Sequence, residues 1–340
     1  MATRLVPSLQ EILYRLAGAA TEASMKQSTS TNPGRFPVVV RPETRAFLEA
    51  QAAHLGGSIA GVAGAILDGV AMTTLARAGG ASTLRGVAER FNILIQEHDL
   101  SLPAAAEALA DLGITLADLA SLDALQLRLS SPVLRSVSER FYVNYGWLAG
   151  KDDQIFQPTP HCWYKEMEAA ADKLVEAKQT CARIELTLFV KHGADLGVID
   201  EDQEWSRLPH FLPMLTRIRD LSGGEALETF EVWDEGRWSY VPCREHIKLV
   251  VHFAYRLGIH VMGKHLAPAD YDLLIEGGAL PATILRRNPS HVSWHPTDYV
   301  VPGSAVAKDS EEWKRIVAHK DYEPTFRHFE KLLERVGRAR

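Results

Sequence analysis

One short strand pattern constrains this chain more than any other feature. Residues 36–40 alternate their apolar side chains in the period of a β-strand. A strand this short does not persist alone in water and needs a partner. The simplest partner is the same strand of a second copy, so we expect a homodimer or a higher assembly of copies.

Two helices are predicted directly after this strand. Pro42 and Glu43 suit the first turn of a helix, Gly56 and Gly57 end it, and Ser58 suits the N-cap of the next helix. The expected apolar faces are Phe47, Leu48, Ala52 and Leu55 in the first helix, and Ile59, Val62, Ile66, Leu67 and Val70 in the second.

The succession of a strand, PET, a helix, LGGS and a second helix resembles the ribbon-helix-helix family of bacterial DNA-binding proteins and antitoxins. The resemblance covers about forty residues. It implies an intertwined dimer with paired strands in the major groove. The implied core residues are Phe36, Val38 and Val40. The implied DNA-facing residues are Arg35, Pro37, Val39 and Arg41, and Ser58 is added as a candidate at the start of the second helix.

This module departs from the family in its chemistry. Base edges are recognised by hydrogen-bonding side chains, which Pro37 and Val39 lack, and basic and acidic residues balance over residues 33–76. Two interpretations therefore stay open. The module either contacts DNA or serves dimerisation without base readout.

Residues 87–150 are predicted to be a small helical module. The expected helices are VAERFNILIQEHDL, SLPAAAEALADLG, ITLADLASL and SPVLRSVSERFYV. Ser101 and Pro103 suit the start of the second helix, and Gly113 has the position of a left-handed turn residue. Trp147 and Leu148 in the closing NYGWLAG are expected to complete the core.

The segments HDLS, ALADLGIT and SERFYVNYGWLAGKDD resemble the Cro-like helix-turn-helix of phage repressors over roughly sixty-five residues. In that family the second helix anchors on phosphate and the third lies in the major groove. The resemblance implies that Ser101 faces phosphate, and that Thr115, Leu116, Asp118 and Ser121 face the bases. Arg128 is a further DNA-binding candidate.

The charge of this module opposes a polyanionic partner. Residues 81–150 contain five basic residues, and eight acidic residues oppose them (Glu89, Glu97, Asp99, Glu107, Asp111, Asp118, Asp123 and Glu139). Phosphate neutralisation supplies most non-specific DNA affinity. The whole chain carries a formal net charge of −6, so it has no general attraction to nucleic acid.

The remaining residues predict an α+β domain. Helices are expected over 160–180, 244–258, 268–278 and 309–338, strands over 182–193 and 259–266, and a hairpin over 229–243 around Asp234, Glu235 and Gly236. Trp233, Trp238 and Tyr240 on this hairpin are candidates for a ligand pocket, although such residues more often form core or an oligomer contact.

No pattern in this region favours catalysis. His291 and His295 have helical spacing, but prolines flank them, so a metal site is not expected. Cys162 and Cys243 lack a nucleophile turn, and the common nucleotide, zinc-protease and hydrolase motifs are missing from the sequence. Three cysteines without CxxC spacing favour a reducing compartment. We therefore expect no enzyme, no cofactor and no metal.

These patterns predict a multidomain fold: an N-terminal ribbon-helix-helix, an all-α helix-turn-helix, and an α+β domain. The expected parts are an N-terminal helix and linker (1–34), a dimerisation module (35–78), a Cro-like module (81–152), and a sensor or interaction domain (160–340). A cytoplasmic regulator of transcription that binds double-stranded DNA fits this order, with a ligand or protein partner at the last domain and no membrane contact. The alternative is an acidic assembly protein that uses repressor-like folds without DNA readout.

Overall fold

The computed structural model describes residues 39–55, 57–67, 83–159, 163–196, 209–288, 293–300 and 307–338. The chain divides into two compact units, residues 1–86 and 87–340. Each unit is described by itself.

The N-terminal unit contains two described helices. Helix α2 (Pro42–Leu55) begins at the predicted proline, and a second helix spans residues 59–67. Val39 and Val40 have no regular secondary structure in the single chain, where no second strand of the described residues pairs with them. The strand that pairs with a second copy stays a prediction. Residues 36–38 of this strand, the N-terminal helix expected within residues 1–34 and the end of the second helix lie outside the described residues.

The predicted helical module is present as a run of short helices. They are α4 (Thr83–Glu97), α5 (Leu102–Ala108), the 3-10 turn η1 (Ala110–Leu112), α6 (Leu116–Leu119), α7 (Leu122–Gln126), α8 (Ser131–Phe141) and α9 (Tyr145–Leu148). Gly113 adopts the predicted left-handed conformation with φ of 73°. Trp147 and Leu148 are buried with Phe91, Leu94 and Val137, so the expected closure of this core is confirmed.

A mixed sheet forms the centre of the rest of the chain and confirms an α+β architecture. Its strands are β1 (Arg183–Lys191), β2 (His210–Asp220), β3 (Ala226–Val232), β4 (Gly236–Arg237), β5 (His260–Leu266) and β6 (Ser293–Trp294). They lie in the order β3-β2-β1-β5-β6, and β4 pairs with β2. Strand β1 is parallel to β5, whereas the pairs β1–β2, β2–β3, β2–β4 and β5–β6 are antiparallel.

The predicted hairpin at 229–243 is wrong. Strands β3 and β4 do not pair with each other, because both pair with different parts of the long strand β2. Strand β2 itself was not predicted. Pro213 lies inside it, and proline argues against a central strand since it cannot donate to the ladder. Here Pro213 still accepts a hydrogen bond from the Trp233 amide at 2.9 Å.

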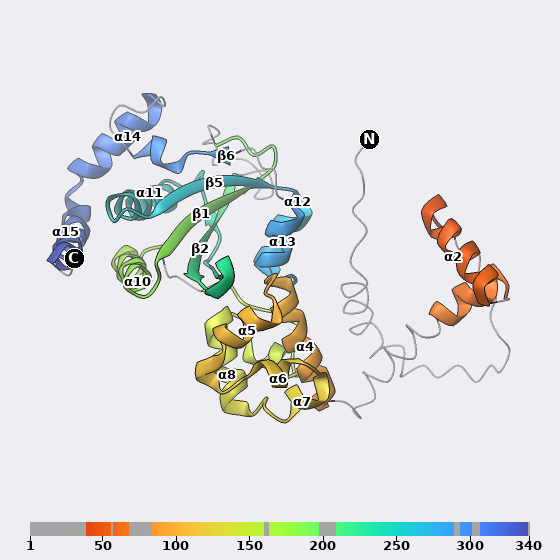
Figure 1. Ribbon diagram of the computed structural model, residues 1–340. Coiled ribbons are helices and arrows are strands. Elements are labelled where there is room, and N and C mark those ends of the chain that lie inside the picture. The colour runs from red at the N-terminus through yellow and green to blue at the C-terminus, as the bar shows by residue number, and fades with distance from the viewer. Residues whose placement is uncertain are drawn as a thin grey trace. The chain divides into compact units, whose positions relative to one another are not determined.

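Helices cover both faces of the sheet (Figure 1). Helices α10 (Met167–Thr180) and α11 (Val241–Arg256) lie on one side, and α12 (Pro268–Glu276) and α13 (Pro281–Arg287) lie on the other. The C-terminal helices α14 (Ala307–Ala318) and α15 (Glu323–Arg338) lie outside α11 and α10. The remaining 3-10 turns are η3 (Ser222–Gly224), η4 (Pro296–Tyr299) and η5 (Lys320–Tyr322).

The helical module and the sheet belong to one compact unit. The Glu107 carboxylate accepts hydrogen bonds from the Ser222 amide at 3.1 and 3.0 Å. Thr283 on α13 donates to Glu97 on α4 at 2.6 Å. The segment at 151–159, between the helical module and the sheet, lies within this unit, where the Ile155 amide donates to the Gly277 carbonyl at 2.9 Å.

Among the described residues no single helix is long and apolar enough to cross a membrane. The helices Pro42–His54 and Ile59–Leu67 meet the length and composition requirement only as a pair, and that pair is bent by 104°.

Candidate functional site

The start of α5 is the position that the repressor resemblance assigns to phosphate. Ser101 is the N-cap of α5, and its hydroxyl accepts a hydrogen bond from the Ala104 amide at 3.3 Å. The same residue donates to the Glu225 carboxylate, from its hydroxyl at 2.6 Å and from its backbone amide at 3.0 Å. These hydrogen bonds lower the pKa of Glu225, because they stabilise the ionised carboxylate. A carboxylate of the same chain therefore occupies the predicted phosphate position.

The predicted recognition helix α6 uses its polar groups within its own turn. Thr115 and Asp118 form a reciprocal capping box, in which each side chain bonds the backbone amide of the other. The Asp118 carboxylate also accepts from the Arg128 guanidinium at 2.9 Å. Hydrogen bonds from Thr115, followed by the bond from Arg128, lower the pKa of Asp118 to about 2. The placement of Asp118 on the base-facing side is therefore wrong, since its side chain is buried in this cap.

The other DNA-facing candidates of this module remain on the surface. Ser121 is the N-cap of α7, where its hydroxyl accepts from the Ala124 amide at 3.2 Å. Leu116 is half exposed, and the neighbouring Leu127 is 87 % exposed. The accessible face of α6 and α7 therefore presents leucine side chains and capped hydroxyls beside the Arg128–Asp118 pair.

Every arginine between residues 87 and 150 has a partner within the chain. Arg90 donates to the carbonyl oxygens of Trp147 and, at 2.8 Å, of Asp152. Arg140 forms a two-bond pair with Asp111. Arg135 stacks over the Tyr145 ring at 5.0 Å. Together with Arg128, these arginines all contact other groups of the same chain.

The N-terminal unit has a different surface. Val39 is 99 % exposed, Arg41 is exposed, and the Ser58 hydroxyl accepts from the Gly61 amide at 3.0 Å, which makes it a helix cap. Arg35 and Pro37 lie outside the described residues. Within this single chain the apolar side chains of Val40, Phe47, Ile59, Ile66 and Leu67 are exposed, although Val40 and Phe47 were expected in a core.

The predicted aromatic ligand pocket lies in the hydrophobic core. Trp233 and Trp238 are buried, and Tyr240 packs partly buried against the same core. The Trp238 ring lies 5.8 Å from Phe211 and 5.2 Å from Tyr299, measured between ring centres. This packing fits the interpretation of these aromatic residues as core.

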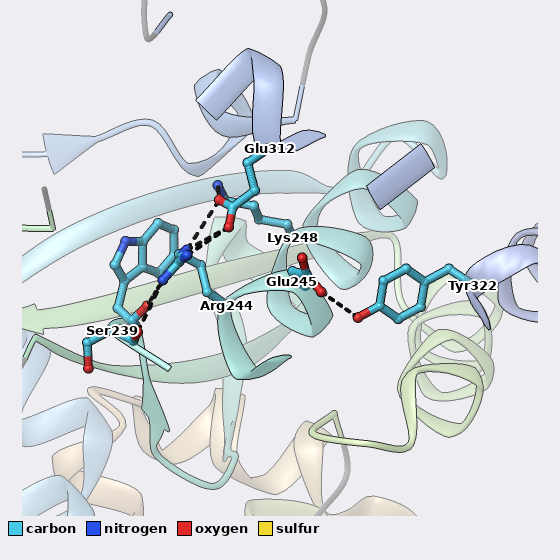
Figure 2. Close-up of polar contacts among 7 residues, drawn as sticks. Ser239, Arg244, Glu245, Lys248, Glu312 and Tyr322 are labelled. Atoms are coloured by element: carbon cyan, nitrogen blue, oxygen red, sulfur yellow. Dashed lines mark hydrogen bonds and ion pairs between the residues drawn. The ribbon is translucent and has the colours of Figure 1, made fainter. Parts of the chain in front are cut away.

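A buried charge cluster in the C-terminal part was not foreseen (Figure 2). Arg244 and Lys248 on α11 both bind the Glu312 carboxylate of α14, with Arg244 Nη2 at 2.8 Å from Glu312 Oε1. Arg244 also donates to the Trp238 carbonyl at 2.7 Å. Despite its burial, Glu312 has a lowered pKa, because the two cations outweigh the desolvation of its carboxylate. The four-residue spacing of Arg244 and Lys248 was a usable signal, but nothing local pointed to Glu312.

Burial shifts the pKa values of the titratable groups near this cluster in directions that favour their uncharged forms. Burial raises the pKa of the Cys243 thiol to about 12, so the thiolate that a nucleophile requires is disfavoured. Burial lowers the pKa of His252 to about 4, and its ring lies 4.8 Å from that of Trp313. Within the described ranges no group of three or more His, Cys, Asp or Glu side chains is placed to hold a metal ion. His291 lies outside these ranges, and His295 is exposed.

Comparison with known proteins adds no relative, since no protein family model, curated protein or solved structure matches this chain.

Proposed function

We propose that this protein is a homodimeric DNA-binding regulator whose DNA contact is made by the N-terminal module at 35–78. In this proposal the repressor-like helices are a structural part of the C-terminal unit. The observation that directs the proposed DNA contact away from these helices is the hydrogen bonding of Ser101 to the Glu225 carboxylate. Arg90, Arg128 and Arg140 of the same module also form hydrogen bonds within the chain, which leaves fewer free donors for phosphate.

The exposed apolar face of the N-terminal unit supports the dimer. Val40, Phe47, Ile66 and Leu67 are all exposed in one chain. Burial of these side chains against a second copy would stabilise a dimer, and the same pairing would supply the missing partner for residues 36–40. Arg35 and Arg41 flank that strand and occur twice in a dimer, which places four cations beside the paired strands.

The second candidate is an assembly protein without DNA readout. It is favoured by the surface of α6 and α7, where Leu116 and Leu127 are exposed and Arg128 is paired with Asp118. Such a surface fits an apolar protein partner better than a phosphate backbone.

Gel retardation with the DNA upstream of the protein's own gene separates the two candidates. The regulator should retain this DNA more strongly than unrelated DNA of equal length, with an affinity that falls steeply between roughly 50 and 200 mM salt. Equal and weak retention of both DNAs at the lowest salt would rule out the regulator. The assembly protein would then be the function that the structure supports.

A further inference from the structure

A hollow of about 530 Å³ lies at the junction of the helical module and the sheet. Its lining comes from η1 and α8 on the helical side, and from the end of α10 and strands β2 and β3 on the other. It lies apart from the predicted aromatic pocket and from the face of α6 and α7.

Three guanidinium groups line this hollow, from Arg140, Arg217 and Arg219. Arg217 and Arg219 are two residues apart on β2, so they project from the same face of the sheet. Arg140 and Arg219 both donate to the Ala108 carbonyl, at 2.5 and 3.0 Å, so two like charges converge on one uncharged oxygen. Two carboxylates, Asp111 and Glu139, share the lining with these three cations.

Arg219 has binding capacity that the fold does not use. A guanidinium carries five N–H donors in a planar fork that matches a carboxylate or phosphate. Arg219 is exposed, and the Ala108 carbonyl is its hydrogen-bond acceptor within the described part of the chain. No carboxylate of those residues lies within ion-pair distance of it. Arg140, by contrast, is held by both oxygens of Asp111.

The wall beside Arg219 is held by contacts within the chain. Arg217 donates to the buried Glu231 at 2.8 Å and stacks over the Tyr142 ring at 4.9 Å. Tyr142 holds this position in a left-handed backbone conformation, with φ of 54°. This conformation ends α8, where the Tyr142 amide donates to the Ser138 carbonyl. Thr180 and Thr229 also line the hollow.

We propose that this hollow binds a small organic or inorganic oxyanion, a carboxylate or a phosphate, with Arg219 as the principal recognition group and Arg217 as its support. The ligand would contact both the helical module and the sheet. This inference is independent of the proposed contact with DNA, because it involves other residues and another class of ligand.

Isothermal titration of the full chain with citrate and, separately, with inorganic phosphate tests this site at constant ionic strength. The expected result is saturable binding of at least one anion, weakened tenfold or more in Arg219→Gln. Arg183→Gln is the matched control. Arg183 is also an exposed arginine of the sheet, but it pairs with Asp220 and lies opposite Ile218, on the other face from Arg219. Its variant should bind like the parent chain.

Alkylation of Cys181 gives a second readout at the same place. This partly exposed thiol lines the hollow, so a bound anion should slow its modification, as mapped by peptide mass spectrometry. Binding that is absent, unchanged in Arg219→Gln, or weakened equally in Arg183→Gln would overturn the proposal. Saturable binding that leaves Cys181 unprotected would also overturn it, since the anion would then lie elsewhere.

Discussion

At the scale of single residues, this chain uses its charged side chains to hold its own fold. Asp118 closes a helix cap, Glu225 binds the start of α5, and Glu312 neutralises two buried cations. The sequence showed that the helical module is rich in acidic residues, and we interpreted them as a net negative charge that repels DNA. The structure shows that Asp111 and Asp118 have specific arginine partners.

The buried cluster around Glu312 makes the sharpest prediction at this scale. Glu312→Gln should lower the free energy of unfolding by about 3 to 5 kcal/mol, because Arg244 and Lys248 would stay buried without their carboxylate. Glu311→Gln is the control, since Glu311 is exposed and pairs with the exposed Lys314. The control should leave the free energy of unfolding measured by urea denaturation almost unchanged, because exposed ion pairs contribute little to stability. Equal effects of the two substitutions would show that the cluster is not a stabilising unit.

Two partly buried histidines predict a loss of stability in mild acid. Burial lowers the pKa of His98 and of His252 from 6.5 to about 4. Between these pH values the unfolded chain binds more protons than the folded chain, so stability falls as pH decreases. Each histidine contributes a slope of up to about 1.4 kcal/mol per pH unit. His252→Phe should reduce the slope of unfolding free energy measured between pH 6.5 and about 4, whereas an unchanged slope would contradict the assignment.

At the scale of elements, local signals predicted the helices better than the strands. Pro42, Ser101, Gly113 and Gly258 marked ends that the structure confirms, because caps and turns are set by neighbouring residues. Strand β2 was missed because Pro213 interrupts its pattern, and β4 was assigned to the wrong partner. Strand pairing depends on residues distant in sequence. The lining of the hollow was unpredictable for the same reason, since it joins residues from five elements.

A substitution of Gly277, at the end of α12, tests whether the segment at 151–159 packs against this helix end. Gly277 has φ of 63°, and a Cβ at this position would lie 1.9 Å from the Phe156 carbonyl oxygen. Gly258 has a similar φ of 72°, but nothing lies within 4 Å of its Cβ position. Gly258→Ala should therefore cost only the left-handed conformation, about 1 to 2 kcal/mol. Gly277→Ala should cost clearly more in the same denaturation experiment, because the backbone of residues 155–156 must move. Equal costs would contradict this docking.

At the scale of the whole molecule, two units carry different surfaces. In the unit at 87–340, helices and sheet share hydrogen bonds through Glu107, Glu225 and Thr283. The N-terminal unit exposes apolar side chains beside Arg41. The sequence contained an order of helices that resembles a repressor. It did not indicate that the polar groups of these helices would be bonded within the chain. Because these surfaces differ, we propose that the N-terminal unit binds DNA and that the unit at 87–340 binds a small anion.

The salt dependence of DNA binding by matched arginine variants tests the central claim most directly. Filter binding to the chain's own upstream DNA should show that Arg41→Ala weakens affinity and reduces the slope of log K against log salt by about 0.9 for each phosphate that the variant no longer neutralises. Arg128→Ala, which removes a cation already paired with Asp118, should leave both affinity and slope unchanged. The reverse result, with Arg128→Ala defective and Arg41→Ala like the parent chain, would place the DNA contact on the repressor-like helices and contradict the account.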